Sequence, residues 1–97
     1  MNVENLPDWA KFNKAENMIE VDPDVVYPLY LEKLGWDKGI LTQNRLECAR
    51  RCFTEDLLKI TGKGLRLRII RDVKYRLSNF PAGDPVSWRL EHRRISA

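Results

Sequence analysis

The strongest constraint on the fold of this chain is an alternation of apolar and basic residues in its carboxyl half. Between Leu65 and Leu77, six of the seven odd positions are apolar, and most of the even positions carry a positive charge. Side chains along a β-strand point alternately to its two faces, so a period of two predicts a strand here. One face of this strand would be apolar and the other basic.

A second run, 86–92, repeats the alternation after a link rich in turn-forming residues. We therefore predict that 65–95 forms a long, basic antiparallel β-ribbon. In one register Tyr75 lies opposite Trp88, an aromatic pair that stabilises a sheet. A register slipped by two residues avoids placing two acids opposite each other. Both registers place the same residues on the apolar face and on the basic face.

A helix is the rival interpretation of the first run. Its apolar residues also recur every four positions, which fits one helical face, and 54–78 would then form a helix-turn-helix. However, Gly64 is a weak helix cap, and a helix would leave Leu67 and Tyr75 on its polar side. The strand is therefore the favoured interpretation.

Two helices are predicted within 22–61. The first opens at 22–24, where a capping aspartate, a proline and a second aspartate occur in succession. It ends at Gly35, which suits a left-handed terminal residue. Pro28 predicts either a kink or a later start. The inward face comprises residues at helical spacing, for which core packing is favoured over a binding role: Tyr27, Tyr30, Leu31 and Leu34.

The second helix has the clearest pattern in the chain. It opens at Thr42 or at Asn44, and the latter would form a capping box with Glu47. It ends at Gly62, and a break after Phe53 is an alternative. Its apolar residues recur at spacings of three and four along one face: Leu46, Ala49, Phe53, Leu57 and Ile60.

The first twenty residues show no clean period, so we predict a partly irregular amino-terminal arm over 1–20. A helical turn at 7–12 would present Trp9 and Phe12 to the core. Residues 18–21 are predicted to form a short strand, which would add a third strand to a ribbon that is only marginally stable alone.

Together these elements predict one α+β domain over 1–97, with two helices packed on a small antiparallel sheet built around a long C-terminal basic β-hairpin. A hydrophobic content of 43% suits an ordinary globular domain. The start of the chain lacks the pattern of a secretory signal, and the longest apolar run, 25–31, is too short to cross a bilayer. We therefore expect cytoplasmic residence and no membrane partner.

Residues suited to catalysis or metal binding are few. The only histidine, His92, lies near the charged end of the chain, away from any candidate nucleophile. Cys48 and Cys52 lack two further ligands for zinc, and a disulfide between them would be strained, so free thiols are expected. The segment 61–64 lacks the glycine spacing of a phosphate loop. The chain is therefore predicted to be non-enzymatic, without metal, cofactor or small-molecule substrate.

Charge is distributed unevenly along the chain. Residues 1–41 have a net charge of −4 and residues 63–97 one of +6, within a total of +3. This asymmetry indicates either a polyanion partner, such as DNA or RNA, or an interaction between the two oppositely charged halves of the chain. An arginine-rich ribbon would fit the major groove or follow the phosphate backbone. The candidate nucleic-acid-binding residues lie on the basic face of the predicted ribbon: Arg66, Arg68, Lys74, Arg76, Arg89 and Arg93.

A second hypothesis remains open. A basic ribbon face also keeps a sheet in solution and discourages edge pairing without binding any ligand. No aromatic side chain lies on that face, so base stacking is not expected. The chain would then be a protein–protein adaptor or regulatory subunit, which recognises an acidic protein or a second copy of itself.

Overall fold

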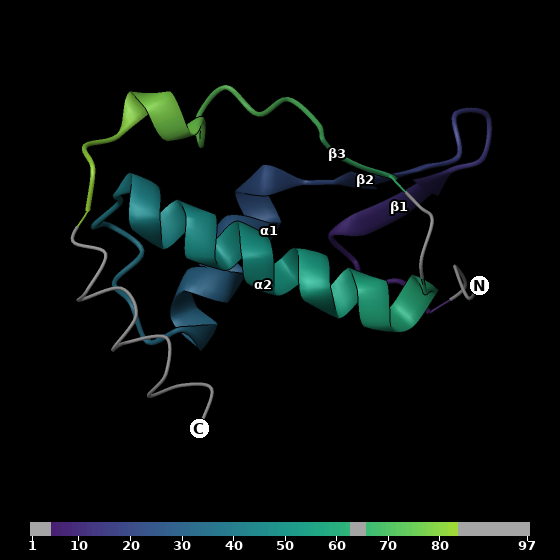
Figure 1. The fold of residues 1–97 in the computed structure, drawn as a ribbon, viewed down its shortest axis with the longest axis horizontal. Coiled ribbons are helices and arrows are strands. Elements are labelled where there is room, and N and C mark those ends of the chain that lie inside the picture. Colours follow the sequence, from purple (N-terminus) through teal and green to yellow (C-terminus); the bar gives the residue numbers. More distant parts are fainter. Residues whose placement is uncertain (1–4, 63–65, 84–97) are drawn as a thin grey trace.

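A computed structural model of the chain describes residues 5–62 and 66–83 (Figure 1). The fold is α+β, with two helices and a three-stranded mixed sheet, which confirms the predicted class. The elements follow in the order β1 (Ala10–Asn13), β2 (Met18–Val21), α1 (Pro23–Lys33), α2 (Gln43–Thr61), β3 (Arg66–Ile69) and the short 3-10 helix η1 (Leu77–Asn79).

The sheet has the strand order β1-β2-β3. β1 and β2 form an antiparallel hairpin in which Ala10 lies opposite Val21. β3 runs parallel to β2, with Met18 opposite Arg66. Parallel strands require a long crossover, and here both helices supply it. The prediction of an antiparallel sheet is therefore wrong for the β2–β3 pair.

The predicted strand over 65–77 is wrong beyond Ile69, where β3 ends and six residues in turns follow. Arg71 has a φ of 54°, a left-handed backbone conformation that cannot continue a strand. The rival helix is wrong as well, because 66–69 is extended. The second half of the predicted β-hairpin falls on 84–97, outside the described residues.

The first helix begins and ends at the predicted caps. The Asp22 side chain accepts a hydrogen bond from the backbone N–H two residues on, at 3.0 Å. At the other end Gly35 has a φ of 79°, and the backbone N–H of Trp36 donates to the carbonyl oxygen of Leu31 at 2.9 Å. Pro28 lies inside one helix, which runs unbroken from residue 23 to 33.

The second helix begins at the first of its two predicted caps. The Thr42 side chain accepts a hydrogen bond from the backbone N–H of Arg45 at 3.2 Å. Asn44 lies within the helix, so the predicted capping box is wrong. The helix continues through Phe53 without a break and ends at Gly62, whose φ is 80°.

The amino-terminal segment is a β-hairpin. The predicted helical turn at 7–12 is wrong, because β1 begins at Ala10, whereas the predicted strand over 18–21 is confirmed. Trp9 precedes β1 and is buried as expected. The hairpin turn passes through Asn17, which has a φ of 53° that asparagine tolerates better than most residues.

The core lies between α1, α2 and the sheet, and its centre is aromatic. The Phe53 ring meets those of Trp9, Tyr27 and Tyr30 edge to face, with ring centroids 5.6–5.9 Å apart. The predicted inward faces of both helices are confirmed. Ile60 is half-buried, and the other predicted residues are buried: Tyr27, Tyr30, Leu31, Leu34, Leu46, Ala49, Phe53 and Leu57.

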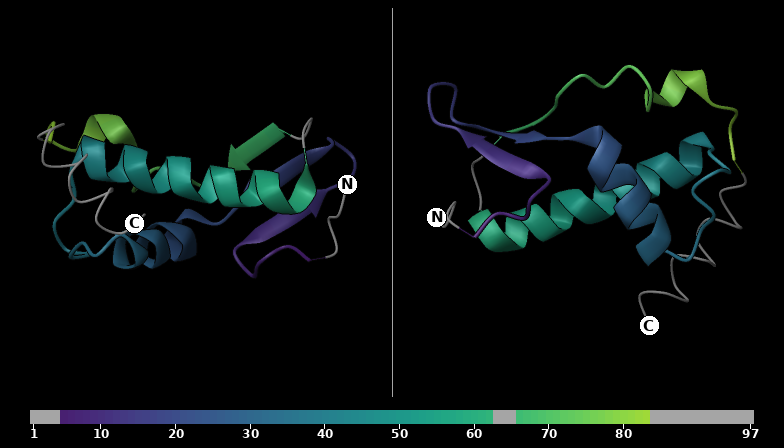
Figure 2. Two further views of the ribbon diagram at one scale, coloured as in Figure 1. Left: turned by 60° about the horizontal axis from the view of Figure 1, so that its bottom comes forward. Right: turned by 180° about the vertical axis from the view of Figure 1, so that it is seen from behind.

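The chain beyond β3 runs back alongside α2 toward the amino-terminal end of that helix, as both Figure 1 and Figure 2 show. Its residues 70–78 are called the return segment below. Tyr75 is buried, and its ring stacks on Tyr27 of α1 with centroids 4.8 Å apart. This aromatic contact holds the return segment against α1.

Candidate nucleic-acid interface

The six predicted site residues are divided between three parts of the chain: β3 (Arg66 and Arg68), the return segment (Lys74 and Arg76), and the part outside the described residues (Arg89 and Arg93). The four described residues are all exposed. Because β3 ends between the first pair and the second, these two pairs have different surroundings.

Arg66 and Arg68 lie on the outer face of the sheet, while Leu67 between them packs against the core. The Arg68 guanidinium forms ion pairs with Glu16 of the β1–β2 turn and, at 3.7 Å, with Glu20 of β2. Such exposed pairs each contribute about 0–1 kcal/mol to stability, but they cancel the local positive potential. Acidic residues of the amino-terminal hairpin therefore neutralise this part of the predicted basic face.

The return segment has a different charge balance. Arg71, Lys74 and Arg76 are all exposed, and Asp72 is the only acid within 70–78. The Asp72 carboxylate is largely buried, with 14% of its side chain exposed, and it pairs with Arg50 of α2 at 3.3 Å. The three exposed cations thus project from a segment whose only negative charge already has a partner.

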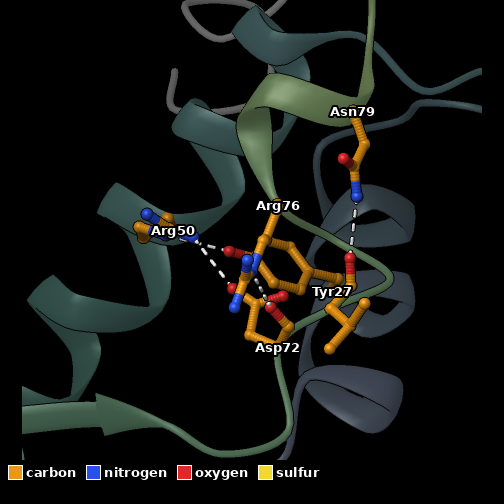
Figure 3. Close-up of polar contacts among 6 residues, drawn as sticks. Tyr27, Arg50, Asp72, Arg76 and Asn79 are labelled. Carbon is orange, nitrogen blue, oxygen red and sulfur yellow. Dashed lines mark hydrogen bonds and ion pairs between the residues drawn. The ribbon is translucent and has the colours of Figure 1, made fainter.

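Arg50 is the link between the return segment and the helices (Figure 3). Its Nε donates to the Tyr27 hydroxyl oxygen at 2.9 Å, and its Nη2 donates to Oδ2 of Asp72 at 3.3 Å. Burial raises the pKa of the Tyr27 hydroxyl, and the nearby Arg50 offsets part of that effect. Tyr27 is therefore a neutral acceptor for Arg50 near neutral pH.

Local hydrogen bonds fix the shape of the return segment. Nε of Arg76 donates to the backbone oxygen of Asp72 at 2.9 Å, and Nδ2 of Asn79 donates to that of Val73 at 2.8 Å. The backbone N–H of Val73 donates to the carbonyl oxygen of Arg71 at 2.9 Å. The basic side chains consequently extend from a backbone whose conformation is held in place.

A groove with a volume of about 670 Å³ lies between α2 and the return segment. Three arginines line it (Arg50, Arg71 and Arg76) together with Asp72, which gives a net charge of +2. A second hollow of about 480 Å³ shares Arg50 and adds Arg51 together with two acids of α2, Glu47 and Glu55, so it has no net charge. Both volumes fall in the range, roughly 300–1,000 Å³, that is typical of ligand sites.

Two residues of this groove were absent from the predicted site. Arg71 occupies the one odd position between 65 and 77 that is not apolar, so it interrupts the pattern on which the strand prediction rests. That interruption was the available signal. Arg50 lies on the flank of α2, and its contact with Asp72, 22 residues farther along the chain, depends on the tertiary fold.

Other types of site find little support in the part of the chain that the structure describes. No group of three side chains there is placed to hold a metal ion. Cys48 and Cys52 do not form a disulfide, and a hydrogen bond with Cys48 lowers the pKa of the Cys52 thiol. None of the helices described is both long and apolar enough to span a membrane.

Comparisons with known proteins do not place the chain in a family. No protein-family model, no curated protein and no solved structure shows a significant match to it. The charge, burial and geometry of the described residues therefore carry the functional argument.

Proposed function

We propose that this protein is a small, non-enzymatic nucleic-acid-binding accessory factor. Its binding surface comprises the return segment and the adjoining side of α2. The outer face of the sheet, which carries Arg66 and Arg68 and is called the sheet face below, contributes less. The observation that carries this proposal is the contrast in charge partners. Arg71, Lys74 and Arg76 are exposed beside an acid that Arg50 already binds, whereas Arg68 is paired with two glutamates.

The surface is suited to the phosphate backbone and less to the bases. A guanidinium presents a planar fork of donors that matches phosphate oxygens, and such contacts position a nucleic acid without reading its sequence. The aromatic residue of the return segment, Tyr75, is only 5% exposed and is stacked on Tyr27, so its ring does not offer a platform for bases. We therefore expect binding with weak sequence preference.

Fluorescence anisotropy with duplex DNA and single-stranded DNA and RNA tests the proposal. If three phosphates of a duplex are neutralised, the slope of log affinity against log salt is about −2.7, so raising salt from about 50 to 200 mM weakens binding about fortyfold. A protein that fails to bind any of these nucleic acids at the lower salt concentration is not a nucleic-acid-binding factor of this kind.

The matched variants are a triple replacement of Arg71, Lys74 and Arg76 by alanine and a double replacement of Arg66 and Arg68 by alanine. The triple variant is expected to lose most of the affinity and most of the salt slope. The double variant is expected to retain both, because the negative charges of Glu16 and Glu20 beside Arg68 already equal the two positive charges that the variant removes. Equal losses in the two variants would contradict the assignment to the return segment.

One observation favours an adaptor role as the second candidate. Val25 and Leu29 lie one turn apart on α1, and they are 47% and 36% exposed. A second copy of the chain is the simplest partner for this apolar strip. Light scattering across a range of protein concentrations tests it: a dimer that Leu29→Lys converts to a monomer supports self-association, and a monomer at every concentration excludes it.

A further inference from the structure

We propose that the groove between α2 and the return segment holds a phosphate monoester, namely the terminal phosphate of a nucleic-acid strand. Arg50, Arg71 and Arg76 would bind it. This inference rests on the proposed function and adds the chemical group that is recognised. It distinguishes the end of a strand, where a monoester occurs, from the interior, where every phosphate is a diester.

The charge of the groove matches this ligand. Three arginines and one aspartate line it, which gives a net charge of +2. A phosphate monoester carries about −1.5 to −2 near neutral pH, because its second pKa is about 6. An internal phosphodiester carries a single negative charge and would leave about one positive charge in the groove uncompensated. The dianionic terminal group is thus the better electrostatic match.

Donors remain available for such a ligand. A guanidinium has five N–H groups. Within the described residues, Arg50 uses one for Tyr27 and one for Asp72, and Arg76 uses one for the Asp72 carbonyl oxygen. The remaining N–H groups of both side chains can bind the three terminal oxygens of a monoester, which is one oxygen more than a diester offers.

The arginines are also held in position before any ligand binds. Tyr27 and Asp72 fix the guanidinium of Arg50, and the backbone of Asp72 fixes that of Arg76 (Figure 3). Asp72 is therefore a positioning residue and does not itself contact the ligand. Ordering side chains in advance lowers the entropy that binding must remove.

Arg71 supplies a separate observation. Its φ of 54° is unfavourable for a residue with a Cβ, and asparagine or glycine would adopt it more easily. Backbone strain of this kind is found preferentially at binding sites. Here the left-handed residue turns the chain out of β3 and brings the Arg71 side chain to the wall of the groove.

The dimensions suit the end of a strand. The groove, about 670 Å³, can take a ligand the size of a terminal nucleotide. The second hollow, about 480 Å³, shares Arg50 and Leu77 with it. Glu47 and Glu55 also line this hollow and balance the charges of Arg50 and Arg51, so the positive charge is concentrated in the groove, where the terminal phosphate would bind.

The test uses the full chain and two single-stranded oligonucleotides of identical sequence, one with a 5′-phosphate and one with a 5′-hydroxyl, both labelled at the 3′ end. We expect the phosphorylated strand to bind at least fivefold more tightly at moderate salt. Arg71→Gln and Arg76→Gln are expected to abolish that difference. Arg68→Gln, a matched change on the sheet face, is expected to leave it intact. Arg71 and Arg76 are exposed, so both test variants should fold.

The possible outcomes separate this inference from the proposed function. Equal binding of the two strands, or a preference that both Arg71→Gln and Arg76→Gln retain, overturns the terminal-phosphate site and leaves nucleic-acid binding in place. If neither strand binds, the proposed function fails.

Two further probes identify the source of the phosphate. Adenosine 5′-monophosphate should displace the phosphorylated strand, and adenosine should not. Binding of the monophosphate without any strand binding would assign the groove to small phosphorylated molecules and overturn the strand-end assignment. A phosphoserine peptide that binds more tightly than the phosphorylated strand would overturn it in favour of a protein partner.

Discussion

The sheet face and the return segment are both rich in basic residues, but the fold places different acidic residues beside them. Arg68 lies on a regular strand beside the amino-terminal hairpin, where Glu16 and Glu20 pair with it. Arg71 and Arg76 lie beyond the point where the chain leaves the sheet, next to one acid that already pairs with Arg50. Neighbouring acids thus neutralise one basic cluster and leave the other with a net positive charge.

The difference follows from the topology. In the parallel pairing of β2 with β3, Glu20 lies beside Arg68, so the acidic part of the chain is brought to the basic part. The return segment runs along α2, where the residue that reaches it is the basic Arg50. One part of the predicted basic surface is thereby neutralised, and the other is reinforced.

The largest expected effect comes from reversing one charge in each region. Arg76→Glu should weaken nucleic-acid binding by about 2 kcal/mol, or about thirtyfold, because it removes a charge-assisted contact and adds a repulsion. Arg68→Glu should weaken it only about twofold. Anisotropy titrations at moderate salt measure both. Similar losses would remove the distinction between the two regions.

A second prediction concerns the contact that holds the return segment to α2. Asp72→Ala should lower the free energy of unfolding by about 1.5 kcal/mol, because Arg50 loses a largely buried ion-pair partner. The loss is smaller than for a fully buried pair because solvent still reaches Arg50. Glu16→Ala, which breaks an exposed ion pair on the sheet face, should cost less than about 0.5 kcal/mol. Urea denaturation provides both values. A smaller loss for Asp72→Ala than for Glu16→Ala would contradict this account.

Local signals made the helices predictable from the sequence. Asp22 and Gly35 cap α1, and Gly62 ends α2, through interactions within a few residues of the chain. The buried faces followed from helical spacing. None of these inferences required knowledge of which distant residues meet.

The sheet was harder to predict because strand pairing is not local. The alternation around Leu67 correctly indicated a strand, but a period of two does not reveal which strand is the partner or where the chain leaves the sheet. The end of β3 depends on the left-handed backbone at Arg71, in a turn closed by hydrogen bonds such as that from Asn79 to Val73. Arg50 could be added to the candidate site only after the tertiary structure showed its contact with Asp72.

A third prediction separates strain from binding in the return segment. Arg71→Asn should raise the free energy of unfolding by about 0.5–1 kcal/mol, because asparagine tolerates the left-handed conformation better than arginine does. The same variant should bind the phosphorylated strand less tightly. Lys74→Asn, whose backbone φ is not positive, is the control for stability and should give no gain. A loss of stability in Arg71→Asn would show that the arginine side chain itself stabilises the turn.

The smallest expected effect tests whether Glu16 and Glu20 prevent the sheet face from binding an anion. Glu16→Gln combined with Glu20→Gln removes both partners of Arg68 while keeping similar side-chain volumes. If pairing alone prevents the sheet face from binding an anion, the double variant should gain about twofold in affinity for duplex DNA at low salt, and the gain should disappear as salt screens the added charge. The gain should also vanish when Arg68→Gln is added, because the released charge belongs to that residue. A gain that persists without Arg68 would mean that the two glutamates act through the overall charge of the protein. Pairing of Arg68 would then not explain why the return segment binds more tightly than the sheet face, and the arginines of the groove would have to account for the difference.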